Sequence, residues 1–490
     1  MSKNALFVII SIFIISIGLR IIGLGDRALW ADEKVSALCS NGLIGTPPNN
    51  INTVYIDGEK STKSFSEIKK ATLIQDSGNG LLYYLFLSYW TEYFGNSDYS
   101  LRFPSFLAGI LFLFIGFIFV KKHFGVNPAI LFLITSSLFS LFIIYSQTAR
   151  SYELAILGTF ASTFIFWEII ERIEKKANRR SILFMALTYF ILLNICMFLH
   201  YYTFYIFAGH ALYLALHHLK NAKLISLFLI IYTAFSIFFF YWMLNGGFEG
   251  YKLMAGRNAY WVQEAKNSGT FFNPVFFIKS FMTFSAAMAG VYMSYIKGFQ
   301  VYYLFPFAII VVFLIINYLK FKRNSNRIVT LFIYTTVIQL SFAFLMALKN
   351  GHVLSLSPYY NIFTIPYILI LFAFISNEIL KRKKYLVVGA FYVIFIIYNS
   401  IFLYFYYSKK NIHHSEVNNP YSEAALIIEK QVNSGDTIVS RQFIDSKLIS
   451  LYTDKSFLFS YNPELEKDEI YIHKNGNLKI SILNLEGKRY

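Results

Sequence analysis

Long apolar runs recur along the chain and are separated by polar segments. Eleven runs approach the roughly 20 residues that a helix needs to cross the hydrocarbon core of a bilayer. They cover residues 5–24, 101–120, 127–145, 153–170, 181–199, 203–219, 224–243, 301–319, 328–347, 359–380 and 385–404. Because lipid offers no hydrogen-bond partners, each segment must pair its own backbone groups, as a helix does. The pattern predicts an all-α polytopic membrane protein with about 11 transmembrane helices.

The polar segments alternate in charge. Five short segments are basic, at residues 121–122, 172–180, 220–223, 320–327 and 381–384. The positive-inside rule puts them in the cytoplasm together with the N-terminus. The other set holds most of the acids and includes two long segments, residues 25–100 and 244–300. We therefore expect a plasma or inner membrane protein whose working face is extracytoplasmic.

Two apolar stretches do not fit this alternation as spans. Residues 80–95 are short and rich in Tyr and Trp, and residues 276–295 contain Lys279. Both are predicted to be helices that lie in the outer membrane interface. The first run, by contrast, leads into its loop without a small-residue cleavage site, so we interpret it as a retained helix and not as a signal peptide.

The last segment of the chain changes character. Residues 421–431 have helical apolar spacing, while residues 436–440 and 478–485 have the character of short strands. We predict a small soluble α/β domain over residues 405–490, on the extracytoplasmic side, after a transmembrane catalytic domain over residues 1–404.

Composition agrees with this division. Hydrophobic residues make up 56% of the chain and charged residues 14%, against roughly 25% charged residues in soluble proteins. Residues 405–490 hold 11 basic and 11 acidic side chains, so the net charge of +17 arises in the membrane portion. The excess lies in the short basic segments and orients the protein. Nucleic acid is therefore not an expected partner.

Adjacent acids lie just beyond the first span, in the sequence Trp30-Ala31-Asp32-Glu33-Lys34. A carboxylate at this depth is partly desolvated, which moves its pKa toward the range of a general base. The pair can also hold a divalent cation, although no cofactor is certain. The alternative is a pair of solvated acids that cap a helix, with Lys34 as a neighbour.

Further polar groups fall at the outer ends of other spans. Arg150 and Glu153 are three residues apart, so they share a face on a helix, and a guanidinium can hold a phosphate. The alternative is a snorkelling Arg150 paired with Glu153. One span ends with His200, Tyr201 and Tyr202, where the histidine can bind a metal, a phosphate or a proton. The alternative is an ordinary aromatic belt with one histidine.

Two more motifs open spans from the same face. They contain Arg102 and Tyr359. All these groups converge on the outer membrane boundary, whereas transporters more often keep polar groups near the midplane. His210 is the main exception, and we expect it to be packed between helices.

In order along the membrane portion, these motifs resemble those of the GT-C superfamily of membrane glycosyltransferases, in the branch of protein O-mannosyltransferases and lipid A aminoarabinose transferases. The sequence around Asp32-Glu33 is similar to the family's acidic motif. Residues 80–84 are similar to its Pro-Leu-Tyr-Tyr stretch, and residues 101–105 to its Leu-Arg-x-Pro-Ser run. Residues 145–152 resemble Tyr-Ser-Gln-Glu-Ala-Arg-x-Tyr, with Thr148 in place of the acid. His200-Tyr201-Tyr202 resembles the His-Tyr-Tyr motif.

The resemblance implies transfer of a sugar from a polyprenyl-phosphate donor in the membrane lipid to a glycan, glycolipid or protein acceptor. It implies Asp32 as the base or metal-linked acid, beside Glu33. Arg150 and His200 would stabilise the departing phosphate, and Tyr152, Tyr201 and Tyr202 would shape the pocket. A polyprenyl-linked glycan transporter or flippase, a glycan polymerase or ligase, and a non-catalytic scaffold are the rival hypotheses.

Overall fold

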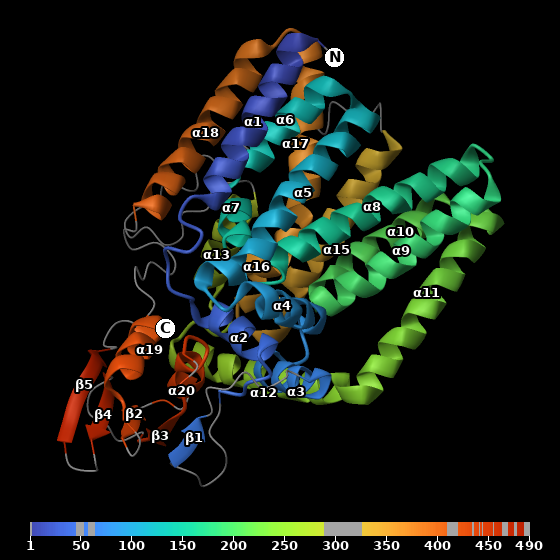
Figure 1. The fold of residues 1–490 in the computed structure, drawn as a ribbon. Helices are drawn as coiled ribbons and strands as arrows, with labels where there is room; N and C mark the ends of the chain where they lie inside the picture. Colours follow the sequence, from blue (N-terminus) through green and yellow to red (C-terminus); the bar gives the residue numbers. More distant parts are fainter. Residues whose placement is uncertain are drawn as a thin grey trace.

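The computed structural model is a bundle of long helices with a small sheet domain at one end (Figure 1). It describes residues 2–45, 53–56, 64–288, 326–408, 420–433, 436–440, 442, 444–453, 455–462, 469–474 and 478–484. Within these residues, eight helices are long and apolar enough to cross a membrane, and a bent pair raises the number to nine. The chain is an integral, multi-pass membrane protein.

The spans coincide with most of the predicted runs. They are α1 (Lys3–Ile21), α5 (Asp98–Phe124), α8 (Tyr152–Glu174), α9 (Arg179–Leu199), α11 (Ala222–Trp242), α15 (Arg327–Asn350), α16 (Pro358–Asn361) with α17 (Ile365–Lys381), and α18 (Tyr385–Tyr407). The run at 203–219 forms α10 (Phe204–His217), whose 14 residues are shorter than the predicted span. The span predicted at 301–319 lies outside the described residues.

One predicted span is broken. Residues 127–145 form α6 (Val126–Leu138) and α7 (Ser140–Ser146), which meet at an angle of 60°. Phe139 is extended between them, so the last carbonyls of α6 lose their helical partners. Arg20 of α1 donates to the carbonyls of Ser136 and Ser137, at 3.0 and 3.1 Å. A fully buried arginine therefore caps a helix end that lipid would leave unpaired.

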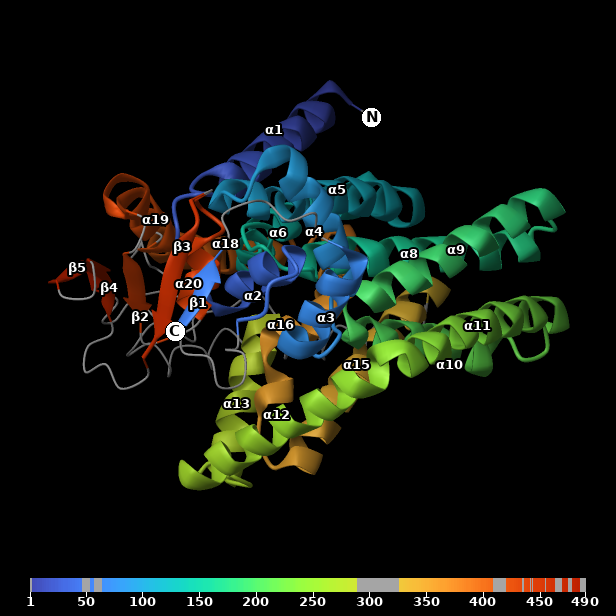
Figure 2. The ribbon, with the colours of Figure 1, turned by 60° about the horizontal axis from the view of Figure 1, so that its bottom comes forward.

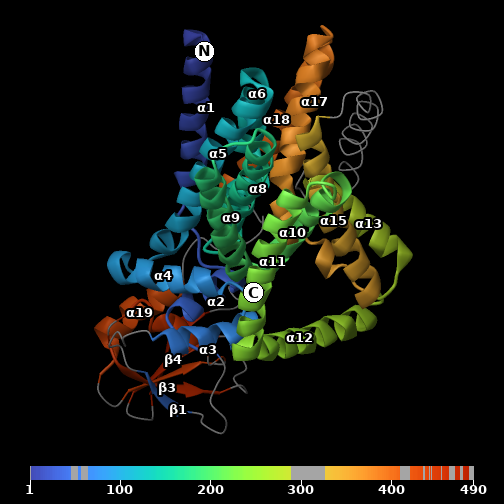
Figure 3. The same cartoon turned by 90° about the vertical axis from the view of Figure 1, so that its right-hand side faces the viewer.

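Shorter helices cover the end of the bundle that faces the sheet. These are α2 (Ala31–Ser40), α3 (Phe65–Asp76), α4 (Leu81–Phe94) and α12 (Phe248–Asn267) (Figures 1 and 3). Helix α4 occupies the stretch predicted as an interfacial helix. Helix α12 continues α11 after a bend at Gly246, whose φ of +137° suits glycine. It runs across the end of the bundle toward α13 (Pro274–Met288) (Figure 3).

The tail forms a sheet with the strand order β1-β3-β2-β4-β5. Its strands are β2 (Thr437–Ser440), β3 (Phe457–Tyr461), β4 (Glu469–Lys474) and β5 (Leu478–Asn484), and its helices are α19 (Pro420–Gln431) and α20 (Ile444–Ile449). The predicted helix at 421–431 and strand at 436–440 are confirmed. The remaining strand, β1 (Thr53–Ile56), comes from the first outer segment and pairs antiparallel with β3 (Figure 2). The sheet therefore extends beyond the predicted boundary at residue 405.

The sheet domain is also fixed to α2. Leu38 of α2 is fully buried in the apolar core of that domain, with residues such as Phe459. Tyr452 donates a hydrogen bond to Asp98 Oδ1 at 2.8 Å, at the start of α5. The helix that carries the acidic motif is thus held between the membrane bundle and the tail.

Candidate active site

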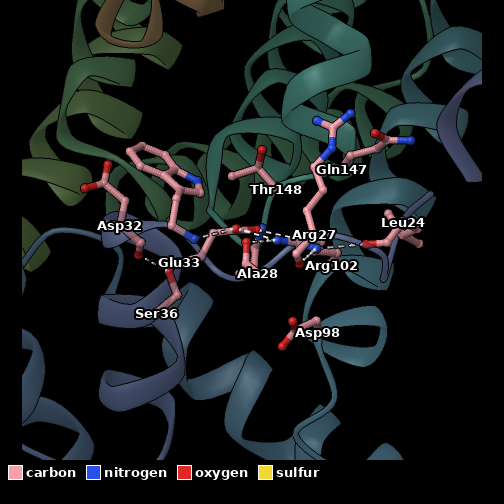
Figure 4. Close-up of polar contacts among 12 residues, drawn as sticks. Leu24, Arg27, Ala28, Asp32, Glu33, Ser36, Asp98, Arg102, Gln147 and Thr148 are labelled. Atoms are coloured by element: carbon pink, nitrogen blue, oxygen red, sulfur yellow. Dashed lines mark hydrogen bonds and ion pairs between the residues drawn. The ribbon is translucent and has the colours of Figure 1, made fainter. Parts of the chain in front are cut away.

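Glu33 and Arg102 form a buried ion pair at the N-terminal end of α2 (Figure 4). Arg102 Nε donates to Glu33 Oε1 at 2.8 Å, and Nη2 donates to Oε2 at 2.7 Å. Such a bidentate pair fixes orientation as well as charge. The other Arg102 donors bind the carbonyls of Leu24, Arg27 and Ala28. Arg102 therefore folds the loop between α1 and α2 around itself.

The two Glu33 oxygens have further donors. Oε1 accepts from the backbone N–H of Ala149 at 2.7 Å, and Oε2 accepts from that of Trp30 at 3.2 Å. With both oxygens engaged by N–H donors, Glu33 does not fit a metal ligand or a proton acceptor. It joins the first outer loop to the turn that precedes α8.

Asp32 lies on another side of α2, and its carboxylate points away from Glu33 (Figure 4). It is half-buried, and no hydrogen bond joins its carboxylate to another side chain in the described part of the chain. Burial raises the pKa of the Asp32 carboxyl above its usual value. The Arg150 guanidinium opposes this rise in pKa, whereas the charges of Asp76 and Glu33 reinforce it. A raised pKa suits a general base.

Arg150 reaches toward Asp32 from the turn between α7 and α8. Nη1 lies 3.4 Å from the Asp32 carbonyl and donates to Tyr84 OH at 2.7 Å. Nη2 donates to Asp76 Oδ2 at 3.1 Å, and Tyr84 donates to the same oxygen. The Arg150 carbonyl accepts from Ser105 Oγ at 3.1 Å. Contacts from α2, α3 and α4 thus fix the guanidinium, while α5 holds the backbone of Arg150. The Arg150 Nε has no hydrogen-bond partner among the described residues.

Asp76 was missed as a site residue. It is the last residue of α3, and the sequence shows it only as one of several acids in a long polar segment. The position where the family motif has its second acid holds Thr148, whose hydroxyl donates to the Ile144 carbonyl at 2.7 Å. The second carboxylate near Arg150 therefore comes from α3.

Aromatic rings continue the site away from Arg150. The guanidinium lies 5.8 Å from the Tyr152 ring, and that ring lies 5.5 Å from His200 and 6.3 Å from Tyr359. Tyr202 stacks on Tyr360 at 4.9 Å and contacts His200 at 5.7 Å. These contacts join six of the expected residues into one cluster: Asp32, Arg150, Tyr152, His200, Tyr202 and Tyr359.

His200 is buried at the end of α9. Burial and the Arg150 charge lower the pKa of its imidazole to about 3, so the ring is neutral near pH 7. Its Nδ1 accepts from the Tyr202 N–H at 3.2 Å. A neutral His200 can donate a hydrogen bond through Nε2, but it brings no positive charge to the site.

Three expected site residues lie elsewhere. The Lys34 ammonium is 5.1 Å above the Tyr421 ring of the tail domain. Tyr201 donates to the Gly78 carbonyl at 2.8 Å and so joins α9 to the turn before α4. Glu153 is fully buried inside the bundle and faces Arg20 instead of Arg150.

A metal site was also expected as an option at Asp32 and Glu33. The described residues contain no group of three or more His, Cys, Asp or Glu side chains that could hold an ion. Arg102 and the Ala149 N–H already bind Glu33. The other two acids of the site, Asp32 and Asp76, lie on either side of the Arg150 guanidinium. The expected Asp32–Glu33 pair therefore does not fit a shared cation.

Comparison with solved structures identifies the fold. The oligosaccharyltransferase AglB from Archaeoglobus fulgidus, in complex with an inhibitory peptide and a dolichol-phosphate, matches with a TM-score of 0.51 and 14% identity, over 92% of this chain and 60% of that one. ArnT from Cupriavidus metallidurans in the apo state matches with a TM-score of 0.52 and 12% identity, over 92% and 85%. No family model and no curated protein matches the sequence.

The chain shares the fold of these two solved structures. It spans about 60% of the length of the archaeal oligosaccharyltransferase, so the likeness to that protein concerns the fold alone.

Proposed function

We propose that this protein is a glycosyltransferase that moves a sugar from a polyprenyl-phosphate-linked donor to a glycan, glycolipid or protein acceptor. The observation that carries this proposal is the meeting of Asp32 and Arg150 at one end of the spans. A lipid-linked donor enters sideways from the bilayer with its phosphate at headgroup depth. The proposal assigns that depth to Asp32 as the base and to Arg150 as the positive charge that such a reaction needs.

Asp32 is the proposed general base. An acceptor hydroxyl attacks the anomeric carbon, its proton passes to the Asp32 carboxylate, and the bond between that carbon and the phosphate oxygen breaks. The raised pKa of Asp32 favours this proton transfer. Glu33 and Arg102 hold α2 in place and do not take part in the chemistry.

Arg150 is the proposed ligand of the departing phosphate. Its charge stabilises the polyprenyl phosphate as the sugar leaves. Asp76 and Tyr84 hold the guanidinium in position before the donor arrives. His200, as a neutral donor, and the rings of Tyr152, Tyr202 and Tyr359 form the wall beside the sugar.

The basic connectors support an extracytoplasmic site. Arg179 begins α9, Arg327 begins α15 and Lys381 ends α17, whereas α8 begins beside Arg150 and ends at Glu174, which pairs with Arg327. These basic residues therefore lie at the ends of the spans away from Arg150. By the positive-inside rule that end faces the cytoplasm, so Asp32 and the tail domain face outward.

The experiment is sugar transfer in lipid nanodiscs from a panel of polyprenyl-phosphate sugars, with wild type, Asp32→Asn and Glu92→Gln. Glu92 is an exposed acid on α4 and serves as the matched control. We expect Asp32→Asn to lose about 10²- to 10⁴-fold in rate, the usual contribution of a general base. Full activity of Asp32→Asn would remove Asp32 as the base. Movement of the lipid across the bilayer without sugar transfer would instead support a transporter.

A further inference from the structure

Two buried polar groups face each other deep in the bundle, below the turn that carries Arg150. They are the guanidinium of Arg20 on α1 and the carboxylate of Glu153 on α8, with side chains that are 1% and 0% exposed. Arg20 Nε and both oxygens of Glu153 have no hydrogen-bond partner among the described residues. Unpaired buried polar atoms are costly, so these three atoms need a ligand.

The space between the two groups exists because residue 109 of α5 is glycine. A methyl group on Gly109 would lie 3.0 Å from Ser146 Cβ, 3.6 Å from Arg20 Nε and 3.6 Å from Glu153 Oε2. No nitrogen of Arg20 lies within 4.0 Å of a Glu153 oxygen, so the two groups form no direct ion pair. The guanidinium and the carboxylate are therefore too far apart to touch, yet both lie close to the same point in front of Gly109.

We propose that one or two water molecules are bound in front of Gly109 and bridge Arg20 to Glu153. The three unpaired atoms offer one donor and two acceptors, which is close to the three hydrogen bonds that a buried water typically makes. The charges favour water over an ion, because the guanidinium repels a cation and the carboxylate repels an anion. A dry gap would instead leave both groups desolvated and unpaired.

The proposed water site is connected to the turn that carries Arg150 through one face of α5. Ser105, one turn before Gly109, donates to the Arg150 carbonyl, and Gln147 donates to the carbonyls of Arg20 and Ile22. The bridging water adds a polar connection between α1 and α8, deeper in the bundle. Together these contacts set the position of α1 relative to the turn that ends at Arg150.

The direct test is a structure of the protein in lipid nanodiscs at a resolution that reveals ordered water. We expect one or two density peaks within hydrogen-bond distance of Arg20 Nε and Glu153, and their loss in Gly109→Ala. A direct Arg20–Glu153 contact, or an empty gap in the wild type, would overturn the proposal.

Thermal unfolding gives an independent test that does not need high resolution. Glu153→Gln keeps an acceptor for the water, whereas Glu153→Leu removes it and leaves the Arg20 Nε unpaired. We expect a melting temperature several degrees lower for the Leu variant than for the Gln variant. A Leu variant that is as stable as the Gln variant would contradict a hydrated site.

Gly18→Ala is the matched control for Gly109→Ala. Gly18 is a helical glycine of α1 with no atom within 4 Å of an added methyl group, so the water peaks beside Arg20 should remain in Gly18→Ala. Neither measurement uses sugar transfer, so a failure here leaves the proposed activity untouched.

Discussion

Glu33 Oε1 accepts a hydrogen bond from the backbone N–H of Ala149 at 2.7 Å. Glu33 follows Asp32 in the chain, and Ala149 precedes Arg150. One buried carboxylate therefore fixes the distance between the proposed base and the proposed phosphate ligand. Positions separated by more than a hundred residues become parts of one site through a group that does no chemistry.

Glu33→Gln is expected to destabilise the protein. The amide has one acceptor oxygen where the carboxylate has two, and Arg102 would keep a buried charge without its counter-charge, a change that costs about 3–5 kcal/mol in other proteins. Chemical unfolding in detergent measures this loss, and transfer activity should fall with it.

The double variant Glu33→Leu with Arg102→Met is the companion measurement. It removes both charges but leaves the carbonyls of Leu24, Arg27 and Ala28 without their Arg102 donor, so it should recover only part of the stability lost in Glu33→Gln. A stable Glu33→Gln protein that has lost transfer would mean that Glu33 acts in the chemistry.

The pH dependence of transfer should report the ionisation of Asp32. A base is active when deprotonated, so kcat/KM should fall as the pH drops through its raised pKa, above the usual carboxyl range. Asp76→Asn removes a charge that raises this pKa, so the acidic limb should move to lower pH. The Glu92→Gln profile should match the wild type. An unchanged limb in Asp76→Asn would argue that another group titrates.

Leu38→Ala should loosen the tail domain from the membrane bundle. Leu38 is fully buried in the core of that domain although it belongs to α2. Loss of a buried leucine side chain costs about 2–5 kcal/mol, depending on how far the site collapses. Limited proteolysis should cleave the tail faster in this variant than in Leu386→Ala, because Leu386 is 89% exposed on α18. Equal cleavage rates would mean that the tail does not depend on α2.

The spans and the tail helix could be predicted because their signals are local. Apolar runs of about 20 residues and helical spacing need no knowledge of distant contacts. The β1 strand could not be predicted, because its four residues lie in a polar segment and pair with β3 about 400 positions later. Its partner, not its own pattern, makes it a strand.

The site was predicted in outline only. The motifs with Asp32, Arg150 and His200 converge as expected, because each ends or opens a helix on one face. Glu33 pairs with Arg102, and Glu153 faces Arg20 without direct contact; neither arrangement has a local signal in the sequence. Asp76 joins the site because α3 ends beside Arg150, which the sequence does not encode as a motif.

A polar network inside the bundle provides the last prediction. Thr163 Oγ1 lies 2.9 Å from His210 Nε2 and 2.7 Å from Tyr367 OH, and Tyr189 OH lies 2.9 Å from His210 Nδ1. These contacts join α8, α9, α10 and α17, so His210 is packed between helices as expected. Thr163→Val would leave buried polar atoms of His210 and Tyr367 with one partner fewer.

We expect Thr163→Val to lower the free energy of unfolding by about 1–3 kcal/mol, the cost of unsatisfied buried groups. Thr188→Val is the matched control, because Thr188 is half-buried and its hydroxyl, among the described residues, bonds its own helix at the Phe184 carbonyl. The control should change stability by less than about 0.5 kcal/mol, as surface substitutions usually do. Unfolding in mixed detergent measures both variants. Equal stability of the two would show that the network adds nothing to the packing of the four helices, because the Thr188 hydroxyl, which bonds within its own helix, would then count as much as the Thr163 hydroxyl.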